Sequence, residues 1–103
     1  MPLNNLSPDD VKQALDTGNV LLIDVREDHE FALGHIEGAI LMPLSQLSEL
    51  DLPKADDKTI ILYCAGGVRS VKAAHICQLR GLKADNHLAG GINAWRAAGL
   101  PVK

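Results

Sequence analysis

The stretch Thr59–Ser70, which reads TIILYCAGGVRS, is the most informative part of this chain for its fold. Residues 59–63 are β-branched or apolar throughout and predict a strand. Cys64 follows the strand directly, and a tight loop with two adjacent glycines leads into a predicted helix over Ser70–Arg80, which Gly81 terminates. Strand, short loop and helix in this order are typical of a parallel α/β sheet.

The rest of the chain continues this alternation. Ser7 is predicted as the N-cap of a first helix, with Pro8 at its first position and Gly18 at its end. Residues 20–25 form an apolar run, as expected of a strand buried on both faces of a parallel sheet. Further elements are predicted as strands at 39–41 and 85–88, helices at 27–33, 45–50 and from Gly90-Gly91 to Gly99, and a loop at 52–58.

These elements predict one α/β domain over residues 1–103. Its central sheet is expected to be mostly parallel, with about five short strands and helices on both faces. Ligands of such sheets bind at the carboxyl ends of the strands, and Cys64 lies at one of these ends.

Composition excludes several classes of protein. A hydrophobic fraction of 47% with 22% charged residues is ordinary for a globular chain, and three aromatic residues imply an aliphatic core. The net charge of −3 does not indicate nucleic-acid binding, which usually requires an excess of positive charge. No apolar run approaches the ~20 residues of a membrane span, and the first residues lack the pattern of a secretory signal. We therefore expect a cytoplasmic protein, with no membrane or nucleic-acid partner.

Charge is uneven along the chain. Residues 1–51 hold ten acids and two bases, whereas residues 52–103 hold three acids and eight bases. The segment from Cys64 to Ala84 carries four bases and no acid. Either the two halves mix in space and the bias vanishes, or a positive field surrounds Cys64 and favours a thiolate and anionic substrates.

The loop after Cys64 has the features of an anion cradle. The following helix directs unpaired N–H groups and about half a positive charge toward it. Gly66 and Gly67 can adopt positive φ, which lets successive N–H groups turn toward one centre, and Arg69 adds a fixed charge. The pKa of Cys64 should therefore lie below the ordinary ~8.5 of a free thiol. The alternative is a buried, inert cysteine at the end of a strand.

Four short motifs, in this order and spacing, resemble the single-domain rhodaneses over nearly the whole chain. Residues 64–70 (CAGGVRS) are similar to the active-site loop of these sulfurtransferases. Residues 24–31, with residues 34–39, resemble the first rhodanese signature, and residues 90–95 resemble the last one. The resemblance implies a rhodanese-like fold and a catalytic Cys64. It also implies that substrate is bound by Ala65, Gly66, Gly67, Val68, Arg69 and Ser70.

The resemblance implies sulfur transfer in two steps. The Cys64 thiolate takes the outer sulfur of thiosulfate or another persulfide donor, and a thiol or protein cysteine then accepts it from the Cys64 persulfide. Covalent catalysis of this kind predicts ping-pong kinetics. The carrier is the modified cysteine, so no cofactor is expected, and the histidines and cysteines fall at no zinc-ligand spacing. We expect a small anionic donor and a monomer or weak homodimer.

Two other functions stay open. The related dual-specificity phosphatases use a loop with five residues between cysteine and arginine, whereas four separate Cys64 from Arg69 here. A shorter ring should suit one sulfur atom better than a phosphoryl group. A non-catalytic interaction module is the second alternative, although that class typically lacks the cysteine. Ala65 and Val68 bring no polar side chain into the loop, which leaves the natural donor open.

Several residues outside the loop proper receive structural interpretations. Ser70 could contact the sulfur, but capping of the helix is favoured. Asp24 is expected to brace the cysteine loop, and Arg26 is expected to pair with Glu30. His35 is interpreted as a hydrogen-bonded turn residue, and both Cys77 and Trp95 as core packing.

Overall fold

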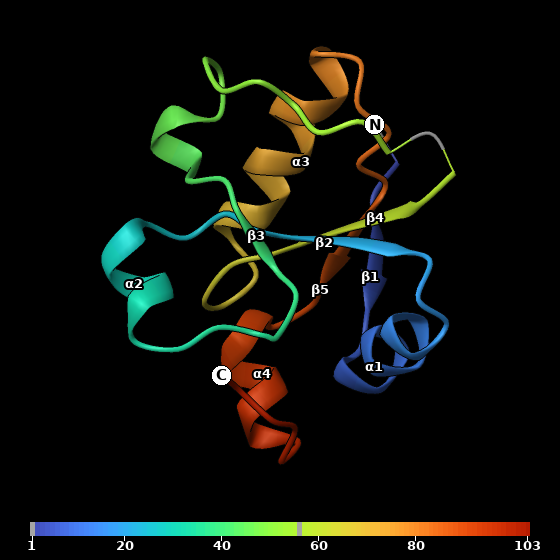
Figure 1. Cartoon of the computed structure of the whole chain (residues 1–103), viewed down its shortest axis with the longest axis vertical. Helices are drawn as coiled ribbons and strands as arrows, with labels where there is room; N and C mark the ends of the chain where they lie inside the picture. Colours follow the sequence, from blue (N-terminus) through green and yellow to red (C-terminus); the bar gives the residue numbers. More distant parts are fainter. Residues whose placement is uncertain (1, 56) are drawn as a thin grey trace.

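The computed structural model describes residues 2–55 and 57–103 and contains strands and helices in alternation (Figure 1). A short 3₁₀ turn, η1, follows the third strand. The elements are β1 (Asn4–Leu6), α1 (Pro8–Asp16), β2 (Val20–Asp24), α2 (Asp28–Ala32), β3 (Ile40–Leu41), η1 (Leu44–Gln46), β4 (Thr59–Tyr63), α3 (Arg69–Leu79), β5 (Asn86–Leu88) and α4 (Gly91–Ala97).

The five strands form one sheet in the order β1-β5-β4-β2-β3, and every pair of neighbours is parallel. β4 lies at the centre and pairs with β2 in continuous register from Val20–Thr59 to Asp24–Tyr63. The predicted α/β fold with a parallel sheet of about five strands is thus confirmed. The two strands from the basic second half of the chain, β5 and β4, lie side by side between strands from the acidic first half.

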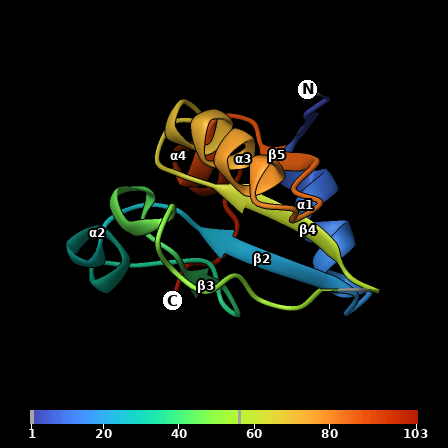
Figure 2. The ribbon, with the colours of Figure 1, turned by 90° about the horizontal axis from the view of Figure 1, so that it is seen from above.

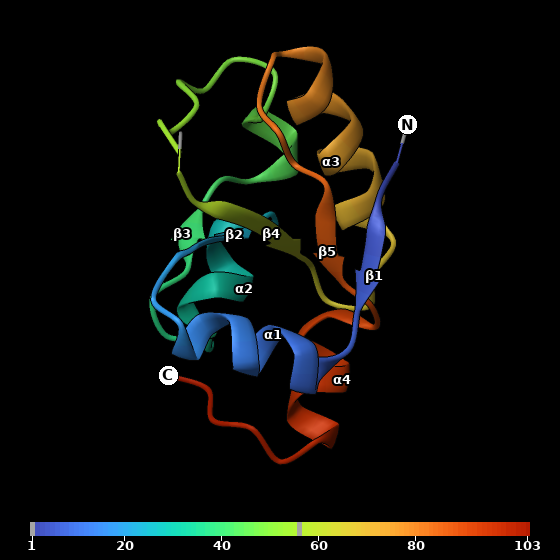
Figure 3. The same ribbon diagram turned by 90° about the vertical axis from the view of Figure 1, so that its right-hand side faces the viewer.

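Two apolar layers cover the sheet. Side chains alternate along β4, so that Ile60 and Leu62 pack with α3 on one face while Ile61 and Tyr63 pack with α1 and α4 on the other. Figure 3 shows the sheet between α3 and the α1–α4 pair. α2 lies beyond the arrowhead end of β2 (Figure 2) and contains no buried residue. Cys77 and Trp95 are buried in the two layers, as predicted.

The first helix begins as the sequence predicts. The N–H of Asp10 donates to Ser7 Oγ at 3.1 Å, and the N–H of Ser7 donates back to the Asp10 carboxylate at 3.1 Å. This capping box satisfies two donors that the helix itself leaves unpaired. Pro8 occupies the first turn, where its missing N–H costs nothing.

Two local features differ from the prediction. β1 was not predicted, because its three residues include two asparagines and occupy the solvent-exposed edge of the sheet, where no apolar pattern is needed. The predicted helix at 45–50 is the 3₁₀ turn η1 followed by further turns. Residues 52–55 and 57–58 form the predicted loop; Asp56, like Met1, lies outside the described residues. Within the described ranges, none of the helices has the length and apolarity needed to cross a membrane.

Candidate active site

Cys64 leaves the end of β4 at the carboxyl edge of the sheet, and the loop 64–68 returns the chain into α3. The start of α4 is hydrogen-bonded to this loop. The N–H groups of Ile92 and Asn93 donate to the carbonyls of Cys64 and Ala65 at 2.9 and 3.1 Å. Gly91 makes the close approach feasible: a Cβ at this position would lie 2.4 Å from both carbonyl oxygens. The glycine pair of the last sequence motif therefore shapes the cysteine loop.

The sulfur of Cys64 is surrounded by hydrogen-bond donors. The N–H groups of Gly67 and Ser70 donate to Sγ at 3.1 and 3.3 Å, and Ser70 Oγ lies 3.5 Å from it. Gly67 reaches this geometry with φ of 93°, a conformation that side chains disfavour. Cys64 is only 1% exposed, so the loop encloses the sulfur closely. The arrangement is a cradle for one small anionic group.

The two buried cysteines differ in acidity. Burial by itself would raise the pKa of Cys64, but the Ser70 hydroxyl and the N–H groups of Ser70, Gly67 and Gly66 outweigh it and lower the pKa below the ordinary value. Burial raises the pKa of Cys77, with the charge of Arg80 opposing it. Hydrogen-bond donors, rather than burial, thus favour a thiolate at Cys64.

The positive charge of Arg69 is directed at α2 rather than at the sulfur. Its guanidinium donates to both carboxylate oxygens of Glu30 at 2.7 and 2.8 Å. These hydrogen bonds, opposed by partial burial, lower the pKa of Glu30 to about 2. The pKa of Arg69 is raised chiefly by Glu30 and less by the charge of Cys64.

The predicted pairing of Arg26 with Glu30 is wrong. Arg26 instead binds Asp24 in a buried ion pair at 2.7 Å and donates to the carbonyl of Gly34. Its guanidinium also lies 5.7 Å from the centre of the Tyr63 ring. Asp24 therefore braces Arg26 rather than the cysteine loop. The reason is local: residues two apart at the end of β2 can close a compact pair, which sequence spacing alone does not reveal.

Ser70 does not cap the helix, contrary to the prediction. α3 begins one residue earlier, at Arg69, and Val68 is the residue that precedes it. Ser70 is fully buried in the first turn, where its hydroxyl contacts both Cys64 and the ring of His87. His35 is hydrogen-bonded as predicted, although it lies just after the turn that ends α2: its Nδ1 lies 3.2 Å from the carbonyl of Phe31.

His87 is the residue near the site that sequence reasoning missed. It lies on β5 opposite Leu62 of β4, and residues paired across a sheet share a face, here the face covered by α3. Strand alternation could have placed His87 on that face, but only once the pairing of β5 with β4 was known.

The remaining loop residues take different positions. Gly66 is exposed, Ala65 is half-buried with its carbonyl bound to α4, and the side chain of Val68 is 81% exposed. Of the six predicted binding residues, Gly67 and Ser70 contact the sulfur directly, and Gly66 N–H contributes to its acidity.

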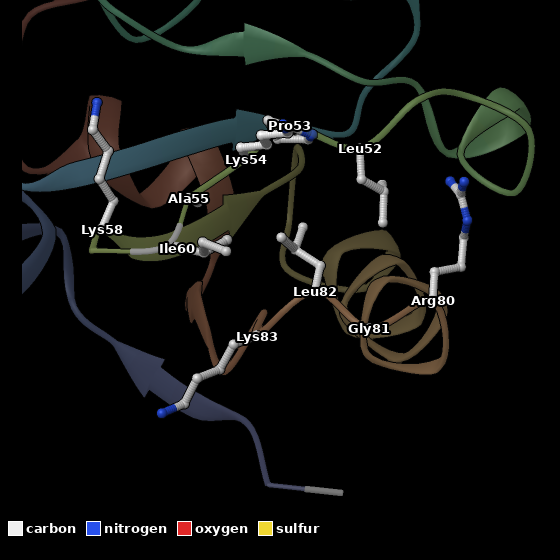
Figure 4. Close-up of a pocket in the computed structure, with 10 residues that line it drawn as sticks. All are labelled: Leu52, Pro53, Lys54, Ala55, Lys58, Ile60, Arg80, Gly81, Leu82 and Lys83. Atoms are coloured by element: carbon white, nitrogen blue, oxygen red, sulfur yellow. The ribbon is translucent and has the colours of Figure 1, made fainter.

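Basic side chains gather away from Cys64. A surface pocket lies at the other end of the strands, where β4 begins and α3 ends. It is lined by aliphatic side chains and by four basic residues (Figure 4). Arg80 and Lys83 belong to this pocket, and Arg69 is paired with Glu30. Of the four bases between Cys64 and Ala84, two thus lie far from the loop, which favours the interpretation that the charge bias is dispersed in space. The lining residues are Leu52, Pro53, Lys54, Ala55, Lys58, Ile60, Arg80, Gly81, Leu82 and Lys83.

Comparison with known proteins agrees with this geometry. The family profile of the rhodanese-like domain matches residues 7–98. The chain belongs to the rhodanese family. An uncharacterized protein of Synechocystis sp. is 41% identical over 97 residues, covering 94% of this rhodanese chain and 54% of that protein. A tRNA uridine(34) hydroxylase of Salmonella newport is 37% identical over 105 residues, covering 91% of this chain and 30% of the hydroxylase. The chain thus spans about half of the first relative and under a third of the second.

Solved structures share the rhodanese fold. A rhodanese-related protein from Thermoplasma volcanium has a TM-score of 0.81 at 30% identity, with 97% of each chain covered. The human single-domain sulfurtransferase has a TM-score of 0.79 at 25% identity, covering 90% of this chain and 95% of the human one. A protein of unknown function from Rhodopseudomonas palustris CGA009, named a possible tyrosine phosphatase, has a TM-score of 0.85 at 32% identity, covering 98% and 85%.

Proposed function

We propose that this rhodanese transfers sulfane sulfur through a persulfide on Cys64. The observation that carries the proposal is the sulfur of Cys64 itself, which accepts hydrogen bonds from the N–H groups of Gly67 and Ser70 in a loop of four residues before Arg69. Such donors stabilise negative charge on sulfur as an oxyanion hole stabilises it on oxygen.

The first step forms one S–S bond and breaks another. The Cys64 thiolate attacks the outer sulfur of the donor, and the donor's remaining part leaves with the bonding electron pair, as sulfite does from thiosulfate. The product is a Cys64 persulfide whose terminal sulfur carries the negative charge. In the second step an acceptor thiolate attacks that terminal sulfur, and the Cys64 thiolate is released. Ping-pong kinetics follow, and no metal or organic cofactor is part of the proposal.

The side chains around the loop bear on the donor. Ala65 and Val68 offer no charge, and the guanidinium of Arg69 is bound to Glu30. The reacting sulfur would therefore be held by backbone N–H groups more than by cationic side chains. This supports a low-molecular-weight or protein persulfide as donor at least as well as thiosulfate, with a thiol or protein cysteine as acceptor and a reducing cytoplasm as the setting.

The relatives support chemistry of this class to different degrees. The human structure is named a sulfurtransferase and is covered almost completely, whereas the tRNA uridine(34) hydroxylase is matched over 30% of its length. The net charge of −3 does not favour tRNA as a partner of this chain, so hydroxylation is not part of the proposal.

Phosphatase chemistry is the second candidate, favoured by the name of the Rhodopseudomonas palustris structure. It would require the loop to bind a phosphoryl group with three outer oxygens. Arg69, the side chain suited to bidentate binding of such a group, is occupied by Glu30, which weighs against this reading.

Intact-mass measurement tests the proposal. Incubation with thiosulfate, or with glutathione persulfide, should add one sulfur atom to the protein, and a subsequent thiol should remove it. Cys64→Ser should take up none, whereas Cys77→Ser, the matched buried cysteine, should behave as the parent. Hydrolysis of an aryl phosphate without any uptake of sulfur would replace the proposal by the phosphatase.

A further inference from the structure

A continuous line of hydrogen bonds leads from the catalytic sulfur to the edge of the sheet. Cys64 Sγ lies 3.5 Å from Ser70 Oγ, which lies 2.8 Å from His87 Nδ1, and His87 Nε2 lies 2.6 Å from Asn5 Oδ1. Cys64, Ser70 and His87 are at most 3% exposed, whereas Asn5 is exposed on the edge strand β1. The line thus connects a buried thiol to the surface at the edge strand β1.

The chemistry of the four groups fixes the direction of the donors. The amide oxygen of Asn5 can only accept, so His87 Nε2 carries a proton. In the neutral ring Nδ1 then has a free lone pair, to which the Ser70 hydroxyl donates. With its hydrogen directed at His87, the Ser70 oxygen can accept from the Cys64 thiol, whose sulfur lies 3.5 Å away. The thiol, the hydroxyl and the imidazole N–H therefore all donate in the direction of Asn5.

We propose that His87 accepts the proton of the Cys64 thiol through the Ser70 hydroxyl and so maintains the reactive thiolate. The Cys64 S–H proton moves to Ser70 Oγ while the Ser70 O–H proton moves to His87 Nδ1, which leaves a thiolate, an unchanged hydroxyl and an imidazolium. No electron is exchanged. The proposal deepens the sulfur-transfer function proposed above and rests on it for its biological role, although the proton transfer itself can be measured without any sulfur donor.

The neighbours of His87 leave the thiolate to compensate a proton on the ring. Burial lowers the pKa of His87, so the ring is neutral at rest with its Nδ1 lone pair free, and the imidazolium is stable only beside the thiolate. From α3 it faces the neutral Ser70, from β1 the neutral amide of Asn5, and from β4 it pairs with Leu62. The charged groups of the site, Arg69 from α3 and Glu30 from α2, are bound to each other. The anion that is hydrogen-bonded to the imidazolium through Ser70 is therefore the thiolate, and the negative charge of the thiolate compensates the positive charge of the ring.

The test is the pH profile of Cys64 alkylation, followed by mass in a Cys77→Ser background. His87→Gln keeps a polar side chain but removes the basic nitrogen, and should slow alkylation at pH 6 about tenfold, the effect of raising the thiol pKa by about one unit. Ser70→Ala should slow it at least as much. Because both act through one line of hydrogen bonds, the double variant should be no slower than Ser70→Ala alone. His75→Gln, on the exposed face of α3, is the matched control and should leave the profile unchanged.

NMR titration of the His87 ring supplies a second readout that folding defects do not imitate. In the parent, the ¹⁵N shifts of His87 should titrate together with Cys64 ionisation, and in Cys64→Ser that shared step should vanish. An unchanged alkylation profile in folded His87→Gln, additive effects in the double variant, or a His87 titration that ignores Cys64→Ser would each overturn the proposal. If these tests confirm the proton transfer but the protein takes up no sulfur, the proposal on His87 is retained and the proposed sulfurtransferase function is rejected.

Discussion

At the scale of single residues, the two cysteines show how neighbouring donors, rather than burial, govern a thiol. Both are buried, yet Cys64 has N–H and hydroxyl groups around its sulfur, whereas Cys77 packs against apolar side chains. The pKa of Cys64 is lowered and that of Cys77 is raised. Since the thiolate is the nucleophile, the two residues should differ in reactivity although their exposure is the same.

Alkylation with iodoacetamide at pH 6.5 should therefore modify Cys64 at least about tenfold faster than Cys77, because a difference of one pKa unit changes the thiolate fraction about tenfold. Peptide mass analysis gives both rates in one sample. The variants Cys64→Ser and Cys77→Ser isolate each thiol. Equal rates, or a faster Cys77, would contradict the cradle and with it the assignment of Cys64 as nucleophile.

At the scale of elements, the pair of Glu30 and Arg69 joins α2 to α3 and limits the charge offered to the substrate. The Glu30 pKa of about 2 lies below the ordinary 4.5, so the pair stabilises the folded state above pH 4.5 and this contribution is lost as the pH falls from 4.5 to 2. Both side chains are partly exposed, so the contribution to the free energy of unfolding is at most about 1 kcal/mol.

Glu30→Gln should release Arg69 toward the loop while preserving the hydrogen bond that Glu30 accepts from the N–H of Glu27. If thiosulfate is a donor, its KM should fall about threefold or more, an effect of about 0.7 kcal/mol, which is within the range of an exposed ion pair. Steady-state kinetics check this, with Glu37→Gln at the exposed Lys103 pair as the control. A higher KM would mean that Arg69 acts on the anion only when Glu30 orients it.

The approach of α4 to the cysteine loop depends on Gly91. It adopts φ of +60°, and an added Cβ would lie 2.4 Å from two loop carbonyl oxygens. Gly18 also has positive φ, of +77°, but an added Cβ there would have no atom within 4 Å. Gly18→Ala should therefore lower the free energy of unfolding by about 1–2 kcal/mol through backbone strain alone, and Gly91→Ala by about 1–3 kcal/mol more through the clash.

Urea denaturation measures both variants, and alkylation of Cys64 reports the loop. Gly91→Ala should also slow the alkylation of Cys64, whereas Gly18→Ala should not. An equal free energy of unfolding for the two variants would show that the cysteine loop shifts to accommodate the extra methyl group without loss of stability.

The elements could be predicted from the sequence, because apolar runs, the Ser7 cap and the terminating glycines are local signals. Partners distant along the chain could not. The binding of Arg69 to Glu30 and of Ser70 to His87 depends on which strands and helices become neighbours. The predicted pairing of Arg26 with Glu30 was wrong for a different reason: sequence spacing alone does not show which of two nearby carboxylates the guanidinium reaches. The site was thus predictable where it consists of backbone, around Cys64, and not where it consists of side chains from other elements.

At the scale of the whole molecule, a buried ion pair lies at the carboxyl edge of the sheet, the edge that carries Cys64. Asp24 is fully buried at the end of β2 and receives three side-chain hydrogen bonds from Arg26. Arg26 also donates to the carbonyl of Gly34, which ties the segment after α2 to the sheet. The hydroxyl of Tyr63, the residue before Cys64, accepts from the N–H of Ile36 in the same region. The cysteine loop therefore rests on an edge whose connections are fixed by polar contacts.

Asp24→Asn should destabilise the whole fold, because it leaves the guanidinium of Arg26 buried without its counter-charge; the expected loss is about 3–5 kcal/mol in the free energy of unfolding. Asp16→Asn breaks the exposed pair with Lys12 and should cost about 0.5 kcal/mol or less. Urea denaturation compares the two, and a double variant, Asp24→Asn with Arg26→Met, should recover part of the loss because it removes the unpaired charge. A loss at Asp24→Asn no larger than at Asp16→Asn would mean that water or a rearranged segment 34–36 compensates Arg26, and that the edge is held by the packing of its apolar side chains instead.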